Sequence, residues 1–104
     1  MIRAEFFESK GILKGIKVSG HAGYGESGSD IVCAAVSSAV QLTANIIDAF
    51  VGCIADVNDS DNSIKCFAEN PGDDSEKIIR SLISHLEAVL DEFPKTIKIT
   101  ISEV

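Results

Sequence analysis

The sequence predicts an α+β fold, in which a mixed sheet of about five strands carries two helices on one face. Three observations support this prediction. Short segments alternate polar and apolar residues, two longer segments carry apolar stripes of helical period, and glycine, proline or asparagine separates the segments. The elements follow the order ββαββαβ. The 104 residues contain no linker or low-complexity stretch, so we expect one domain over residues 1–104.

The first 19 residues predict a β-hairpin. Ile2, Ala4 and Phe6 share one face of a strand over residues 1–8, and a second strand over residues 12–19 returns after a turn at residues 9–11. This second strand ends directly before residues 20–38, which read GHAGYGESGSDIVCAAVSS. We therefore expect His21, the first reactive side chain of that stretch, to lie at the edge of the sheet.

The remaining elements follow from periodicity and from residues that break it. A helix is predicted over residues 31–51 and ends at Gly52. Strands over residues 53–57 and 63–68 flank a polar turn. A second helix starts at Asp73, where the segment Asp73-Asp74-Ser75-Glu76 resembles a capping box, and ends before Pro94. Residues 96–103 form the last strand.

The stretch 20–38 contains the residues that thiol catalysis requires. His21 stands at a strand end, and Cys33 lies near the start of the first predicted helix. The thiolate is the attacking species, and unpaired N–H groups at a helix N-terminus favour it. If Asp30 is the N-cap, Cys33 is the third helical residue, and the same N–H groups could form an oxyanion hole. His21 could take the thiol proton.

From the residues alone, other interpretations stay open. A cysteine in an apolar helix is more often a core residue, and a histidine at a strand end more often lies on the surface. Asp30 could orient His21 instead of capping the helix, although we favour the cap. The glycine-rich residues 22–29 contain no lysine or arginine, so a lid over a peptide is favoured over a phosphate cradle. His85 is a second candidate base, at the border of the second helix.

Composition and charge indicate which cellular compartment and which partners to expect. Three cysteines are an odd number, so we expect reduced thiols, with Cys53 and Cys66 in the core. No secretory leader and no apolar run of bilayer length is apparent, which predicts a cytoplasmic protein without a membrane partner. The net charge of −7 disfavours nucleic acid and suits a basic partner. No motif for a metal or cofactor is present, so none is expected.

The segment GHAGYGESGSDIVCAAVS closely resembles the signature of the ribosomal-processing cysteine protease (Prp) family. That signature is a Gly-His pair, a short loop, then Asp-Ile-Val-Cys-Ala and a serine. The matching positions are Gly20, His21, Gly25, Asp30, Ile31, Val32, Cys33, Ala34 and Ser37. The resemblance implies a cysteine endopeptidase with Cys33 as nucleophile and His21 as its base. Gly20, Asp30 and Ser37 are assigned supporting or substrate-binding roles.

The resemblance also implies a substrate and an assembly. The expected substrate is the N-terminal extension of a large-subunit ribosomal protein precursor, removed during ribosome maturation, and the expected assembly is a homodimer. One alternative is a non-catalytic ribosome-assembly or protein-binding module, in which Cys33 only packs and is no more reactive than the other cysteines. A redox enzyme would need a resolving cysteine near Cys33, and a transferase would need a cofactor motif; the sequence offers neither.

Overall fold

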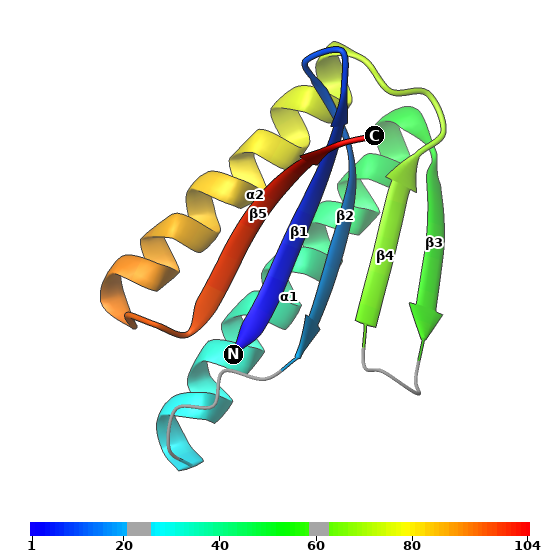
Figure 1. Cartoon of the computed structure of the whole chain (residues 1–104). Helices are drawn as coiled ribbons and strands as arrows, with labels where there is room; N and C mark the ends of the chain where they lie inside the picture. Colours follow the sequence, from blue (N-terminus) through cyan, green and yellow to red (C-terminus); the bar gives the residue numbers. More distant parts are fainter. Residues whose placement is uncertain (21–25, 59–62) are drawn as a thin grey trace.

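A computed structural model describes the backbone of residues 1–20, 26–58 and 63–104, and the side chains of residues 1–20, 31–54 and 63–104. Its elements are β1 (Ile2–Ser9), β2 (Ile12–Gly20), α1 (Glu26–Val51), β3 (Cys53–Asn58), β4 (Ser63–Ala68), α2 (Asp73–Glu92) and β5 (Ile97–Glu103) (Figure 1). The predicted α+β class and the order ββαββαβ are confirmed. Most boundaries agree with the prediction to within a residue or two, and α1 is the exception.

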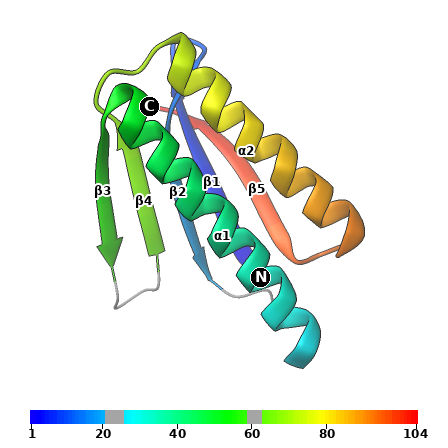
Figure 2. The same ribbon diagram turned by 180° about the vertical axis from the view of Figure 1, so that it is seen from behind.

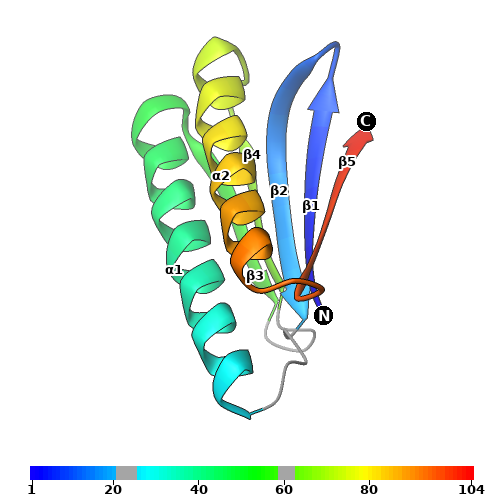
Figure 3. The same cartoon turned by 90° about the vertical axis from the view of Figure 1, so that its left-hand side faces the viewer.

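The five strands form one mixed sheet in the order β3-β4-β2-β1-β5. The pair β1–β5 is parallel, and the pairs β1–β2, β2–β4 and β3–β4 are antiparallel. Both helices lie on the same side of the sheet (Figure 3), and α1 lies beside α2 when the molecule is seen from behind (Figure 2). In the described part of the chain, no helix covers the opposite side of the sheet.

The hydrophobic core fills the space between the sheet and the two helices. Alternate strand positions and the inward faces of the helices supply it, because side chains repeat every second residue in a strand and every three to four in a helix. Its members are Ile2, Ala4, Phe6, Leu13, Ile16, Val18, Val32, Val36, Val40, Ile47, Cys66, Ile79, Leu82, Ile83, Leu86 and Ile97. One continuous core therefore holds the helix that carries Cys33 against the sheet.

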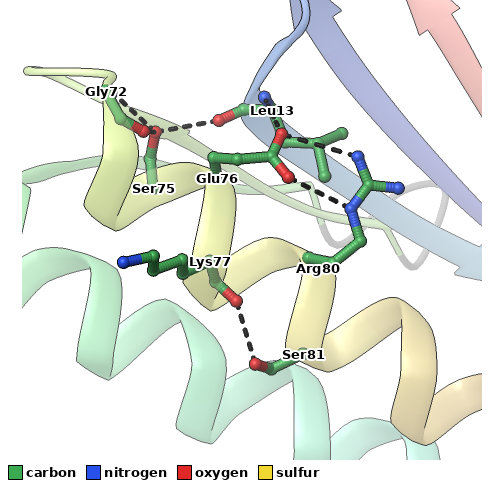
Figure 4. Close-up of polar contacts among 7 residues, drawn as sticks. All are labelled: Leu13, Gly72, Ser75, Glu76, Lys77, Arg80 and Ser81. Carbon is green, nitrogen blue, oxygen red and sulfur yellow. Dashed lines mark hydrogen bonds and ion pairs between the residues drawn. The ribbon is translucent and has the colours of Figure 1, made fainter.

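A polar network fixes the start of α2 against β2 (Figure 4). The fully buried Ser75 Oγ donates to the Leu13 carbonyl at 2.8 Å and accepts from the Gly72 N–H at 3.0 Å. Glu76 Oε1 accepts from the Leu13 N–H at 3.0 Å, and Arg80 Nε donates to Glu76 Oε2 at 3.1 Å. The N-cap is Gly72, one residue before the capping box predicted over residues 73–76, and Ser75 supplies the side-chain half of the box at N3. These contacts set the position of α2.

The expectation of three reduced thiols is wrong for two of the cysteines. Cys53 on β3 and Cys66 on β4 form a disulfide, and their Cα atoms are 5.9 Å apart. Cys53 pairs with Ala68 and Cys66 with Ala55, so the cysteines are diagonal neighbours on one face of the sheet. The sequence did not show this pairing, because the register of β3 and β4 creates the proximity. Cys33 is the free cysteine.

By length and composition alone, Ile31–Val51 in α1 would suffice to cross a bilayer, with a mean hydropathy of 1.5. This contradicts the expectation that no apolar run is long enough. The buried side chains Val32, Val36, Val40 and Ile47 pack into the core, as in the core helix of a soluble protein. Only 28% of the segment is buried, however, so much of this apolar helix faces outward.

Candidate active site

The predicted site stretch starts where β2 ends. β2 runs toward the same end of the molecule at which α1 begins, so Gly20 and the first turns of α1 share that end (Figure 1). We call this the site end. The opposite end, where the β1–β2 turn meets the start of α2, is called the anchored end. The topology therefore puts both the first residue of the stretch 20–38 and its helical part at the site end.

Gly20 has a backbone conformation that favours glycine. Its φ is +87°, in the left-handed region, and an added Cβ would lie 2.7 Å from the carbonyl oxygen of Met1. Gly20 pairs with Ile2, so it still belongs to the sheet. This position at the end of β2 therefore favours glycine for a conformational reason, and the supporting role expected for Gly20 in the site stays a prediction.

Cys33 is half-buried on α1 and packs against the hydrophobic core. The neighbouring Val32 is fully buried, whereas Ala34 is exposed, which places Cys33 at the border between the core and the surface. A thiol in this position is held by packing and remains partly accessible. Ser37 lies one turn later and is exposed, on the same side of the helix as Cys33.

The prediction that Cys33 lies in the first turn of its helix is wrong. α1 begins at Glu26, so Cys33 is its eighth residue and Asp30 lies inside the helix instead of at the N-cap. Seven residues of helix span about 10 Å, and the effect of the helix dipole falls off within the first turn. The unpaired N–H groups at the start of α1 therefore lie too far from Cys33 to stabilise its thiolate or an oxyanion. The glycine-rich stretch did not prevent helix formation from Glu26 onward.

Two predictions for the stretch lie outside the described residues. His21 and the first part of the proposed lid belong to residues 21–25, and the side chain of Asp30 also lies outside them. The assignment of His21 as the base, and any contact between Asp30 and His21, therefore stay predictions. Gly20 and Cys33, which precede and follow residues 21–25 in the chain, are the predicted site residues of this stretch that can be described together with Ser37.

The other candidate base, His85, lies on α2 and not in this stretch. It is exposed on α2 and lines a groove of about 520 Å³ between the two helices. The groove is mainly apolar; its lining is Ala35, Ser38, Ala39, Leu42, Thr43, Ile46, Ile78, Ser81, Leu82 and His85. Cys33 does not line this groove. His85 is thus an exposed residue at the border of the helix, and its role as a base stays a prediction.

A family model, a relative in sequence and solved structures all match this chain. A family model described as Cysteine protease Prp matches residues 1–98. The "Ribosomal processing cysteine protease Prp" of Staphylococcus aureus (strain Mu50) is 28% identical over 94 residues, which is 86% of this chain and 88% of that protein. The crystal structure of SMU.848 from Streptococcus mutans superposes with a TM-score of 0.79 at 25% identity, covering 100% of this chain and 96% of that one.

Crystal structures of the Staphylococcus aureus Prp share the same fold. One, described as an essential ribosomal processing protease with a covalently linked product peptide, has a TM-score of 0.79 at 24% identity, covering 98% of this chain and all of that one. A second, with a substrate peptide, has a TM-score of 0.77 at 22% identity over the same shares. The family match, which spans nearly the whole chain, defines a cysteine protease. The chain belongs to the cysteine protease Prp family.

Proposed function

We propose that this protein is an endopeptidase that removes the N-terminal extension of a large-subunit ribosomal protein precursor. The observation that carries the proposal is the free, half-buried Cys33, at the border of the core, in a chain of the Prp family. We propose a cytoplasmic location as well. A basic precursor fits the net charge of −7, because an acidic enzyme attracts a basic chain.

In the proposed mechanism, Cys33 Sγ attacks the scissile carbonyl and His21 accepts the thiol proton. His21 then returns the proton to the leaving amine, and water releases the acyl group from the sulfur. The left-handed backbone of Gly20 and the packing of α1 on the core, which holds Cys33, support this proposal. Ser37, exposed one turn after Cys33, is placed to contact substrate. Of residues 22–29, expected as a lid over the peptide, residues 26–29 belong to α1, so only residues 22–25 stay proposed for that role.

The test is mass spectrometry of a full-length ribosomal precursor after incubation with wild type, Cys33→Ala and His21→Ala. We expect one specific cut by the wild type, with the released N-terminal peptide detected, and no cut by either variant. Circular dichroism of both variants checks that they remain folded. A precursor that co-purifies with the protein but stays uncut by the wild type would instead support a binding module. Normal cleavage by Cys33→Ala would reject the nucleophile.

We also propose that the chain forms a homodimer through the outward face of α1. Ile31, Leu42 and Phe50 are 57%, 60% and 70% exposed there. Leu42 also lines the groove between the helices. Asp48 is the one charged residue in Ile31–Val51. Two copies that each carry a charge of −7 repel one another over most of their surfaces, so an uncharged apolar face favours contact with a second copy.

The dimer is tested by light scattering coupled to size exclusion. Leu42→Glu should convert a dimer to a monomer, because it places a charge on the apolar face. Ile54→Glu is the matched control: Ile54 is equally exposed, at 60%, but lies on β3 beside Phe67, on the other side of the sheet. A monomeric wild type, or a dimer that only Ile54→Glu disrupts, would contradict the proposed interface.

A further inference from the structure

The uncovered side of the sheet carries paired positive charges. We call it the open face and define it by the described side chains Arg3, Glu5, Phe7, Lys17, Lys65, Phe67, Lys98 and Thr100, which alternate with buried residues along β1, β2, β4 and β5. Lys17 stands directly opposite Lys65, and Arg3 stands directly opposite Lys98. Like charges directly opposite one another destabilise a sheet. A sheet that keeps two such pairs on one face is suited to an anionic ligand.

These four cations are not neutralised by ion pairs within the described residues. The ion pairs found there are Lys77–Asp73 and Arg80–Glu76, both inside α2. Among the described side chains, Glu5 lies opposite Lys17 in register, and the backbone of Asp56 pairs with Lys65. The register thus gives four basic positions against two acidic ones. A hollow of about 190 Å³ between Arg3, Glu5, Lys98 and Thr100 adds a recess bordered by two of the cations.

The net charge of −7, which predicts no nucleic-acid partner, is unevenly distributed. The two helices hold nine of the sixteen acidic residues and only two of the nine basic ones. Both helices lie behind the sheet when it is viewed from the open face (Figure 3). At physiological salt, exposed charges farther apart than about 8 Å are largely screened from one another. The open face can therefore attract an anion although the whole molecule is acidic.

An aromatic surface lies in the next row of the same face. The rings of Phe7 and Phe67 stack, with centroids 5.4 Å apart and an interplanar angle of 28°. Gly15 lies between them in register, and an added Cβ there would meet the ring atoms of Phe67. Atoms along one edge of the Phe67 ring thus cover the backbone of Gly15, and the ring remains partly exposed on the open face. Flat aromatic rings beside cations are the elements with which open sheets bind single-stranded nucleic acid.

We propose that the open face binds single-stranded RNA, with Lys17, Lys65, Arg3 and Lys98 on phosphates and a base stacked on Phe67. An acidic peptide would satisfy the lysines but has no use for the partly exposed ring beside them. The choice of RNA rests on the proposed function: if the protein cleaves its precursor during ribosome maturation, it does so close to ribosomal RNA. This site lies on the opposite side of the sheet from α1 and Cys33, so RNA and the peptide could be bound together.

The experiment measures fluorescence anisotropy of a labelled 12-nucleotide single-stranded RNA against protein concentration at several salt concentrations. Lys17→Gln/Lys65→Gln should weaken binding about tenfold or more and lower the slope of log K against log salt by about 1.4, the value for two phosphate contacts on a single strand. Phe67→Leu keeps an apolar cover over Gly15 and should weaken binding on the order of tenfold without changing that slope.

Lys77→Gln/Lys95→Asn is the matched control. It removes the same amount of charge from exposed positions off the open face, so RNA affinity should change less than twofold. Equal losses in both double variants, or wild-type binding no tighter than that of a labelled poly-glutamate peptide, would overturn the proposal. Cleavage of a short peptide is measured in parallel and should be unchanged in Lys17→Gln/Lys65→Gln. Binding is read without turnover, so failure of the RNA proposal and failure of the protease proposal give different results.

Discussion

The two ends of the molecule are fixed by different means. At the anchored end, polar contacts between distant segments hold the chain: Ser75 and Glu76 of α2 bind the backbone of Leu13, and the Lys10 N–H donates to Glu103 of β5. At the site end, the Ile2 N–H donates to the Thr96 carbonyl at 2.9 Å, and the described feature where β2 ends is a backbone conformation, the left-handed φ of Gly20. Apolar packing then holds Cys33.

Because the two ends are held by different contacts, substitutions at one end should affect stability and substitutions at the other should affect activity. Hydrogen bonds between α2 and β2 are far from Cys33, so their loss should lower the free energy of unfolding and leave the chemistry intact. Changes in the stretch 20–38 should lower catalysis, and those that also disturb packing should lower stability as well. Each prediction below can therefore be measured twice, once by urea unfolding and once by peptide cleavage.

The largest effect is expected from the two histidines. His21→Gln should lower kcat/KM by a factor of about 100 to 10,000, the range for loss of a general base, whereas His85→Gln on α2 should leave it within about twofold. Steady-state kinetics on a fluorogenic peptide that spans the cleavage site measures both. If His85→Gln is the inactive variant, the base comes from α2 and the Cys33–His21 dyad is wrong.

Gly20→Ala should affect both measurements. The left-handed backbone disfavours alanine by roughly 1–2 kcal/mol, and the Cβ would press on the Met1 carbonyl, so we expect a stability loss of about 2 kcal/mol and roughly tenfold lower kcat/KM. Gly11→Ala is the control at the anchored end. Its φ is +78° with no atom within 4 Å of the added Cβ, so it should lose about 1 kcal/mol and keep full activity. Equal activity loss in both would show that the direction of the chain after Gly20 is unimportant.

Sequence patterns predicted the fold better than they predicted the surroundings of Cys33. Alternation and helical stripes are local, so β1, β2, β4 and α2 could be placed to within a residue or two. The start of α1 was misplaced, because the glycines and serines before Ile31 are poor helix formers and yet the helix begins at Glu26. The Cys53–Cys66 disulfide was missed because it depends on strand register.

The cluster of cations on the open face is another feature that sequence patterns did not predict. The sequence gives a net charge, and from that sum we expected no nucleic acid. Only the register of β1, β2, β4 and β5 shows that Lys17 meets Lys65 and that Arg3 meets Lys98. Family resemblance, in turn, supplied the roles of Cys33 and His21, which composition and spacing had left open. Long-range pairing is the information that the sequence alone did not provide.

A smaller effect is expected at the anchored end from Ser75→Ala. The variant removes the hydroxyl that donates to the buried Leu13 carbonyl and accepts from the Gly72 N–H, and an unsatisfied buried group costs about 1–3 kcal/mol. We expect about 2 kcal/mol less stability by urea unfolding, with unchanged kcat/KM at low urea. Ser81→Ala, on the exposed side of α2, removes only a bond to the Lys77 carbonyl and should change stability by less than about 0.5 kcal/mol (Figure 4). Similar losses in both would mean that burial of Ser75 is not the cause.

The smallest effect is expected from Glu76→Gln, and it depends on pH. The hydrogen bond from Arg80 and the Leu13 N–H hold the pKa of Glu76 below its ordinary value of 4.5, against the opposing effect of burial. A carboxyl whose pKa is lower in the folded state stabilises the fold above the unfolded value and loses that contribution as pH falls through the folded value. The side chain is 24% exposed, so the contribution at pH 7 should be about 1 kcal/mol.

Urea unfolding of wild type and Glu76→Gln from pH 7 to pH 3 measures this contribution. The difference in stability should be constant from pH 7 to about pH 5 and shrink below pH 4.5, because the protonated glutamic acid and the glutamine then present similar neutral groups to Arg80. A difference that stays constant to pH 3 would mean that the glutamate acts through packing and not through its charge. Peptide cleavage at pH 7 should be the same in both proteins, since the Leu13–Glu76–Arg80 contacts lie at the end of the sheet opposite to Gly20.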